Sequence, residues 1–175
     1  ILTPSTKEAE GHDTPASGQE LVASGVVSAD LWQEIERASI ALYKRGQQLM
    51  AQRGLILVDT KYEFGIADGR LVIADEIHTP DSSRYWYADG YAERFASGDH
   101  QKELDKETFR RWLVDRGFSG DGDAPAIDDD VRCQTALRYM EAFKAITGDD
   151  FEPVHGTAHA ARVAVASLLA EVFGG

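Results

Sequence analysis

Two short segments rich in strand-forming residues, joined by a turn signal, constrain the fold of this chain more than any other feature. The first spans residues 55–64 and the second residues 70–76, with Asp68 and Gly69 between them. Val, Ile, Tyr and Phe favour strands, and Asp-Gly is a strong signal for a hairpin turn. The sequence therefore predicts an antiparallel hairpin within a larger sheet.

Segments with helical periodicity lie on both sides of this hairpin. Apolar residues recur at steps of three and four over residues 29–52, and Ser28 can cap the start of that helix. Residues 77–104 contain turn residues and an aromatic cluster but no sustained period, which predicts a long loop. Further helices are predicted from Asp105 to Gly117, over about 130–147 and over about 157–173.

This pattern predicts an α+β fold in which helices pack on an antiparallel sheet. We divide the chain into a polar lead-in over residues 1–27 and an α+β domain over residues 28–175. No apolar run approaches the ~18 to 20 residues that a membrane span needs.

The net charge of the chain limits the classes of molecule that it can bind. The formal net charge is -12, so the field of the whole chain repels nucleic acid and anionic membranes. A small anionic substrate must therefore be held by a few local Lys and Arg side chains. The single cysteine, Cys133, provides neither a disulfide framework nor a thiolate metal site, which fits a reducing cytoplasm.

The first predicted strand carries three charged residues that share a face if the strand alternates regularly. These residues are Asp59, Lys61 and Glu63. A buried strand has no structural use for such a row, and carboxylate oxygens favour magnesium or manganese over zinc. The alternative is an exposed strand face with ordinary ion pairs.

The length of the hairpin loop decides which acidic residue lies opposite Lys61. A three-residue loop, with Gly69 in a left-handed bulge, places Asp75 there, whereas a two-residue loop places Glu76 there. Ala67-Asp68-Gly69 suits the three-residue geometry. We therefore predict that Asp75 joins Asp59 and Glu63 around Lys61, where a cation or the Lys would offset their repulsion.

A turn with anion-binding chemistry follows the hairpin. It begins at Pro80 and contains Ser82, Ser83 and Arg84, which offer two hydroxyls and a forked guanidinium. Such groups suit a phosphate or carboxylate. Pro-Asp-Ser-Ser is also ordinary turn chemistry, so the interpretation rests on its position directly after the acidic hairpin.

An ordered set of short motifs resembles the family of phosphoribosylaminoimidazole-succinocarboxamide synthase (SAICAR synthetase). That family joins L-aspartate to carboxyaminoimidazole ribonucleotide (CAIR) with hydrolysis of ATP, in purine biosynthesis. The resemblance covers residues 1 to about 115. The motifs are Thr-Pro-Ser-Thr-Lys at 3–7, Gly-His-Asp at 11–13, Leu-Val-Asp-Thr-Lys-Tyr-Glu-Phe-Gly at 57–65, Asp-Glu-Ile-His-Thr-Pro-Asp-Ser-Ser-Arg-Tyr-Trp at 75–86 and Asp-Lys-Glu-Thr-Phe-Arg-Arg-Trp-Leu at 105–113.

The resemblance implies ATP and Mg2+ as cofactors and CAIR, L-aspartate and ATP as small-molecule partners. It implies that Glu63 and Asp75 are the magnesium–nucleotide carboxylates, and that Asp59 and Lys61 line the imidazole nucleotide and the site of phosphoryl transfer. It also implies a set of residues that bind or approach the substrates: Lys7, Asp13, Ser82, Ser83, Arg84 and Arg110.

One element of the family is absent from the sequence. The family has a two-lobed, ATP-grasp-like architecture with a glycine-containing nucleotide loop in its amino-terminal lobe, and no such loop is present here. The expectation is therefore a carboxyl-terminal portion that lacks that lobe. Two alternatives stay open: a small-molecule kinase of related architecture, and a non-catalytic nucleotide-binding module.

Overall fold

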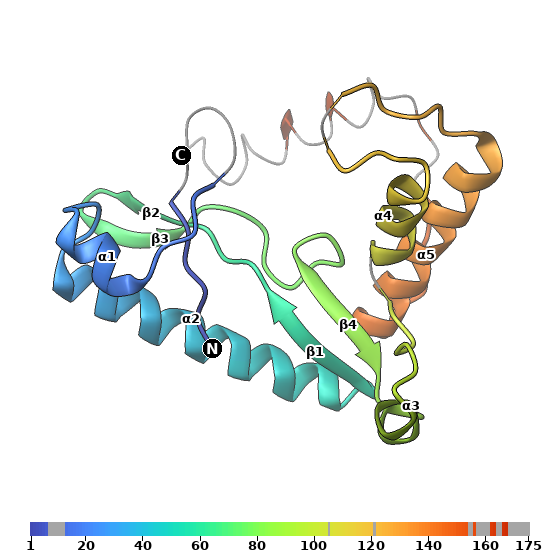
Figure 1. Ribbon diagram of the computed structural model, residues 1–175, viewed down its shortest axis with the longest axis horizontal. Coiled ribbons are helices and arrows are strands. Elements are labelled where there is room, and N and C mark those ends of the chain that lie inside the picture. Colours follow the sequence, from blue (N-terminus) through green and yellow to red (C-terminus); the bar gives the residue numbers. More distant parts are fainter. Residues whose placement is uncertain are drawn as a thin grey trace.

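The structure is a computed structural model that describes residues 1–6, 13–104, 106–120, 122–153, 156, 162–163 and 166–167. Its elements combine helices with short antiparallel strands, so the predicted α+β class is confirmed (Figure 1). In chain order they are α1 Gly18–Ala23, α2 Ala29–Ala51, β1 Leu55–Thr60, β2 Phe64–Ala67, β3 Arg70–Ile73, β4 Ser83–Tyr87, α3 Tyr91–Ser97, α4 Glu107–Val114 and α5 Asp129–Thr147.

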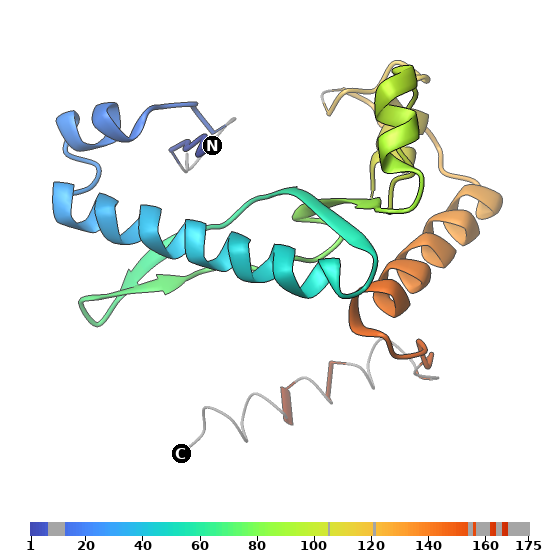
Figure 2. The ribbon, with the colours of Figure 1, turned by 90° about the horizontal axis from the view of Figure 1, so that it is seen from below.

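The described strands form two separate antiparallel pairs. β1 pairs with β4, and β2 pairs with β3. Helix α2 runs along both pairs and contacts β1 and β3, while α4 and α5 lie toward the far end of the β1–β4 pair (Figures 1 and 2). None of the described helices is both long enough and apolar enough to cross a membrane.

Helix α2 confirms the prediction made for residues 29–52. The hydroxyl of Ser28 accepts a hydrogen bond from the Leu31 amide at 3.2 Å, which satisfies one of the unpaired amides of the first turn. Gly54 then takes a left-handed conformation, with φ of 69°, and the chain turns into β1. Ser39, Gly46 and Met50 form the buried side of the helix.

The core lies between α2, the β1–β4 pair and α5. Tyr85 is fully buried, with 0% of its surface exposed, and Leu57 and Leu104 are each 1% exposed. At roughly 25 cal/mol for each Å² of apolar surface removed from water, such residues carry much of the stability. The core cluster consists of Met50, Leu55, Leu57, Tyr85, Leu104 and Ala142.

Strand β1 contains an irregularity that redirects its charged end. Leu57 lies opposite Tyr85, but Asp59 lies opposite Arg84, so Val58 is an extra residue in the ladder. The hydroxyl of Tyr43 on α2 donates to the carbonyls of Leu57 and Val58, at 3.0 and 2.7 Å. This bulge breaks strict alternation, so Asp59 does not follow Leu57 into the buried face.

The predicted three-residue hairpin loop is wrong. Ala67 pairs with Arg70, which leaves a two-residue loop of Asp68 and Gly69 with φ of 51° and 73°. Two positive φ angles are the signature of the type I′ turn, whose twist matches that of the flanking strands, and Asp tolerates the left-handed region better than most residues. The hairpin therefore takes the two-residue register.

The prediction that residues 55–64 pair with residues 70–76 is wrong for most of the first segment. Only β2 and β3 form the local hairpin, and β1 takes the distant strand β4 as its partner. The predicted loop over residues 77–104 accordingly contains β4 and α3. Periodicity measured along the chain does not reveal a strand whose partner lies far away in sequence.

The remaining predictions concern the segments toward the two ends of the chain. The lead-in over residues 1–27 contains α1, whose start is held by a capping box between Ser17 and Glu20. The helix predicted over 130–147 is confirmed as α5. The helix predicted over 157–173 falls largely outside the described residues, as does the proposed cap at Asp105.

Candidate active site

A charged pocket of about 190 Å³ opens where the chain passes from one strand pair to the other. Its lining combines two lysines, four carboxylates and one hydroxyl. Three segments distant in sequence contribute to it: the connection between β1 and β2, the segment between β3 and β4, and the start of α4. The lining residues are Lys61, Glu63, Asp75, Glu76, Asp81, Ser82 and Lys106.

Backbone hydrogen bonds position the first wall of the pocket. The Lys61 amide donates to the Ser82 carbonyl at 2.9 Å, which extends the β1–β4 ladder by one residue. The Ala74 amide donates to the Glu63 carbonyl at 2.9 Å, which extends the β2–β3 ladder. Lys61 and Glu63 therefore stand on a short crossover that both ladders hold in place.

Lys61 is the centre of the charge network. Its ammonium group lies 2.7 Å from the Glu63 carboxylate and 3.6 Å from that of Asp13. The pKa of Lys61 is raised above its ordinary value, chiefly because its ammonium donates to Glu63, so the side chain is cationic at neutral pH. This ion pair brings Asp13 of the lead-in segment beside Lys61, whereas Lys7 lies outside the described residues.

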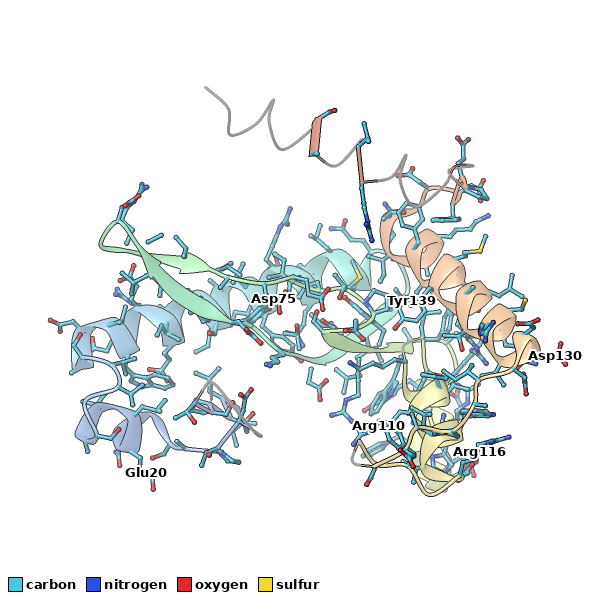
Figure 3. The ribbon with its side chains drawn as sticks, turned by 90° about the horizontal axis from the view of Figure 1, so that it is seen from above. Glu20, Asp75, Arg110, Arg116, Asp130 and Tyr139 are labelled. Carbon is cyan, nitrogen blue, oxygen red and sulfur yellow. The ribbon has the colours of Figure 1, made fainter. Side chains whose placement is uncertain are left out.

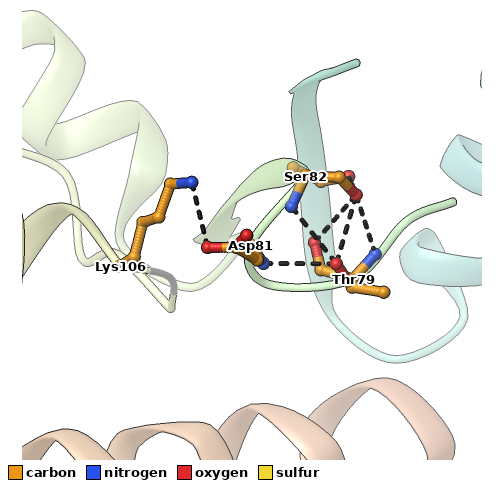
Figure 4. A network of polar contacts seen from close by, with 5 residues as sticks. Thr79, Asp81, Ser82 and Lys106 are labelled. Carbon is orange, nitrogen blue, oxygen red and sulfur yellow. Dashed lines mark hydrogen bonds and ion pairs between the residues drawn. The ribbon is translucent and has the colours of Figure 1, made fainter. Parts of the chain in front are cut away.

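A compact turn forms the second wall (Figure 4). The Thr79 amide donates to the Ser82 hydroxyl at 3.2 Å, and the amides of Asp81 and Ser82 donate to the Thr79 hydroxyl at 3.3 and 3.2 Å. Lys106, just before α4, reaches Asp81 at 2.9 Å. These contacts fix the orientation of the turn toward the pocket.

Arg84 on β4 and Asp59 on β1 lie opposite each other in the ladder and form an ion pair. The Arg84 Nε lies 2.9 Å from both carboxylate oxygens of Asp59, and a terminal nitrogen makes a further contact. Asp59 is not among the pocket-lining residues. The Ser83 side chain is buried, and its hydroxyl donates to the Thr60 hydroxyl at 2.8 Å.

The predicted convergence of three carboxylates around Lys61 is found only in part. Glu63 and Asp75 share the pocket with Lys61, but Asp59 is paired with Arg84. Glu76 lines the pocket together with Asp75. The β2–β3 ladder ends at the bond between Glu63 and Ala74, so the length of the hairpin loop does not decide which of the two acidic residues approaches Lys61. Within the described residues no group of three His, Cys, Asp or Glu side chains is arranged to hold a metal ion.

The donor set nevertheless fits a magnesium ion that enters with a nucleotide. Mg2+ keeps much of its water and is commonly bound by one or two carboxylates together with substrate phosphates. Glu63 and Asp75, on the two walls of one pocket, supply that number of carboxylates. A cage of three protein ligands is not required for this kind of site.

Arg110, which the family resemblance implies as a substrate-binding residue, stands outside the pocket lining. It is exposed on α4 and is not among the lining residues, and in Figure 3 it and Arg116 lie on opposite sides of that helix. Sequence reasoning missed Asp81 and Lys106 as pocket residues. Both stand inside motifs that carry the family resemblance, next to residues that were selected, so position within those motifs was the available signal.

The fold and the pocket define a class: an α+β protein with a charged pocket at the junction of two antiparallel strand pairs. Residues 1–126 match the family model of SAICAR synthetase. The chain belongs to the SAICAR synthetase family.

Relatives and solved structures agree with this assignment. The chain is 47% identical over 154 residues to a phosphoribosylaminoimidazole-succinocarboxamide synthase of Cytophaga hutchinsonii, covering 87% of the chain and 50% of that protein. It is 47% identical over 154 residues to the enzyme of the same name from Bacteroides thetaiotaomicron, covering 86% and 49%. The chain spans about half the length of the curated relatives it matches.

Two solved structures share the fold. SAICAR-synthase from Saccharomyces cerevisiae complexed with SAICAR superposes with a TM-score of 0.69 at 30% identity, covering 87% of this chain and 48% of the other. A SAICAR synthetase in complex with ADP superposes with a TM-score of 0.57 at 29% identity, covering 81% and 48%.

Proposed function

We propose that the protein containing this chain is an ATP-dependent ligase that joins L-aspartate to CAIR, giving SAICAR, ADP and phosphate. The observation that carries the proposal is the pocket in which Lys61, Glu63 and Asp75 meet, because these residues stand in the motifs that the family match includes. One of the two superposed structures is a complex with SAICAR and the other a complex with ADP, which supports the same substrate classes.

The reaction requires a carboxylate to be activated before an amine can attack it. Transfer of a phosphoryl group from ATP gives an acyl phosphate, and the amine of aspartate then displaces phosphate to form the amide. Little covalent chemistry falls to the protein, whose tasks are positioning and charge compensation. A pocket built of opposed cations and carboxylates is suited to both tasks.

We assign roles within the pocket on this basis. Lys61, held cationic by Glu63, compensates charge on the transferring phosphoryl group. Glu63 and Asp75 would hold Mg2+, which when bound neutralises phosphate charge. Asp59 holds the Arg84 guanidinium from one side and so orients it as a binder of a substrate anion.

The remaining substrate contacts come from neighbouring segments. Ser82 presents its hydroxyl to the pocket, and Ser83 braces the same turn from its buried side. Asp13, beside Lys61, brings the lead-in close to the reacting groups. Lys7 and Arg110 complete the proposed set of substrate-binding residues.

We further propose that residues 28–175 bind substrate and metal while a separate amino-terminal lobe binds the nucleotide phosphates. Two observations support this division: the chain spans about half of its relatives, and its sequence contains no glycine-rich phosphate loop. The reaction would take place in the cytoplasm, in keeping with the composition of the chain.

The test uses the full-length protein. ATP hydrolysis should require CAIR and aspartate together, and mass spectrometry should identify SAICAR as the product. Residues 1–175 alone should bind ATP poorly and show no turnover. ATP consumption that needs no aspartate and yields a phosphorylated product would instead identify a kinase, and the absence of any turnover would favour a binding module.

A further inference from the structure

The side chains of Tyr62 and His78 form a contact, outside the pocket lining, between the segments that carry the two walls. Tyr62 lies between the pocket residues Lys61 and Glu63, and its hydroxyl is 2.5 Å from Nε2 of His78. The two rings meet edge to face, with centroids 5.6 Å apart and an interplanar angle of 63°. Neither residue lines the pocket, and both are half-buried.

His78 is held in place by more than this hydrogen bond. Its backbone takes a left-handed conformation with φ of 56°, which is uncommon outside glycine. Its carbonyl accepts a hydrogen bond from the hydroxyl of Tyr85, the most deeply buried side chain of the core. A backbone kept in such a conformation is maintained by its surroundings, and it sets the direction of the turn that begins at Thr79.

Helix α2 closes the space behind the imidazole. A Cβ added at Gly46 would lie 2.5 Å from Cε1 and 2.8 Å from Nε2 of His78, so only glycine lets the ring approach the helix this closely. The ring is therefore confined between α2 on one side and Tyr62 on the other.

Tyr62 and His78 belong to the two segments that carry opposite walls of the pocket. Tyr62 stands at the crossover where the β1–β4 ladder gives way to the β2–β3 ladder, within the wall that carries Lys61 and Glu63. His78 stands between Glu76 and Asp81, within the opposite wall. A bond between Tyr62 and His78 therefore ties one wall to the other.

We propose that Tyr62 and His78 are positioning residues, which set the separation between the two walls of the pocket and so place Lys61 and Glu63 against Glu76, Asp81 and Ser82. This inference rests on the proposed ligase function, which it deepens by assigning residues that do not touch substrate. Burial lowers the pKa of His78 and raises the pKa of Tyr62 to about 12, so both groups are neutral near pH 7. Their contact is therefore a hydrogen bond between neutral groups.

The experiment compares four variants in the full-length protein. Tyr62→Phe removes only the hydroxyl. His78→Asn removes the imidazole but keeps a residue that tolerates positive φ. Gly46→Ala leaves both partners intact, but its Cβ would meet the His78 ring and also the core side chain of Leu57, at 2.8 Å, so it displaces the ring and disturbs the core. Tyr87→Phe is the matched control, because it removes a tyrosine hydroxyl that donates to Glu141 on α5 at 2.7 Å, outside the pocket lining.

The readouts separate positioning from stability. Tyr62→Phe, His78→Asn and Gly46→Ala should each lower kcat about 10-fold or more, because misplacement of reacting groups by as little as 1 Å has effects of this order. In Tyr62→Phe and His78→Asn the KM values should change less than twofold and Tm should stay within about 5 °C of the wild type, whereas Gly46→Ala should also lower Tm because its Cβ meets Leu57. Tyr87→Phe should keep the wild-type kcat. The double variant Tyr62→Phe/His78→Asn should be no slower than its slower parent, because both changes break one contact.

Crystal structures of the wild type and Tyr62→Phe provide a readout that needs no activity, and the two walls should lie farther apart in the variant. Wild-type kcat in Tyr62→Phe, a loss as large in Tyr87→Phe, or unchanged wall positions would overturn the proposal. An inactive wild type with a displaced wall in the variant would contradict the ligase function but support the positioning role.

Discussion

The two strand pairs of this protein differ in what they bury. The β1–β4 pair contributes Leu55, Leu57 and Tyr85 to the core, with exposures of 2%, 1% and 0%. The β2–β3 hairpin leaves Ile66 and Ile73 at 56% and 39% exposed. Stability therefore comes mainly from the first pair, while the charged pocket lies at the junction with the second. We expect substitutions to separate stability from activity along this division.

The largest expected effect is a loss of stability on substitution in β1. It tests whether the β1–β4 pair stabilises the fold more than the β2–β3 hairpin does. Leu57→Ala should lower the free energy of unfolding by about 3 kcal/mol, because it removes a buried side chain and leaves a cavity. Ile66→Ala, its control on the exposed hairpin, should change the same free energy by no more than about 0.5 kcal/mol. Denaturant titration measures both. Equal losses would show that the hairpin is as much a part of the core as β1.

Substitution of the pocket carboxylates should have the opposite profile. Glu63→Gln and Asp75→Asn should each lower turnover about 100-fold or more, the scale of losing one strong electrostatic contact in such a site. Neither should lower the Tm of the metal-free protein, since the Lys61 side chain that pairs with Glu63 is 57% exposed and carboxylate repulsion is relieved.

Glu76→Gln is a third substitution of a pocket carboxylate, to be compared with Asp75→Asn. Glu76 lines the same pocket as Asp75, so the loss of turnover in Glu76→Gln should approach that in Asp75→Asn. An Asp75→Asn enzyme with a normal requirement for magnesium would contradict the proposed metal role.

The Arg84 pair should show an intermediate effect, on binding. Arg84→Lys keeps the charge but loses the forked geometry, so apparent affinity for the nucleotide substrate should fall by about 2 kcal/mol, with the fold retained. Isothermal titration calorimetry measures the affinity. Unchanged affinity would restrict Arg84 to its pairing with Asp59.

The smallest expected effect is the dependence of stability on pH near His78. Burial lowers the pKa of His78 below its ordinary value of 6.5, so the unfolded state takes up the proton first as the pH falls. The stability that neutral His78 contributes is complete above pH 6.5 and is lost as the pH falls below it. Thermal unfolding of the wild type should show this decline, and His78→Asn should lack that part of it.

Patterns in the sequence predicted the features that depend on residues only a few positions apart in the chain. The start of α2 follows from the Ser28 cap, α5 follows from its periodicity, and the existence of the β2–β3 hairpin follows from Asp68-Gly69. The selection of Lys61, Glu63, Asp75 and Ser82 as pocket residues came from charge placement and from the family motifs.

What the sequence by itself determined was therefore the fold class, the main helices, the presence of a hairpin at Asp68-Gly69 and part of the charged lining of the pocket. Only the tertiary structure decided that β1 pairs with β4, that a bulge at Val58 turns Asp59 toward Arg84, and that Lys106 joins the pocket. The physical reason is the range of the interactions. Caps, turns and periodicity act within a few residues of chain, whereas strand pairing and ion pairing depend on which distant segments the core brings together.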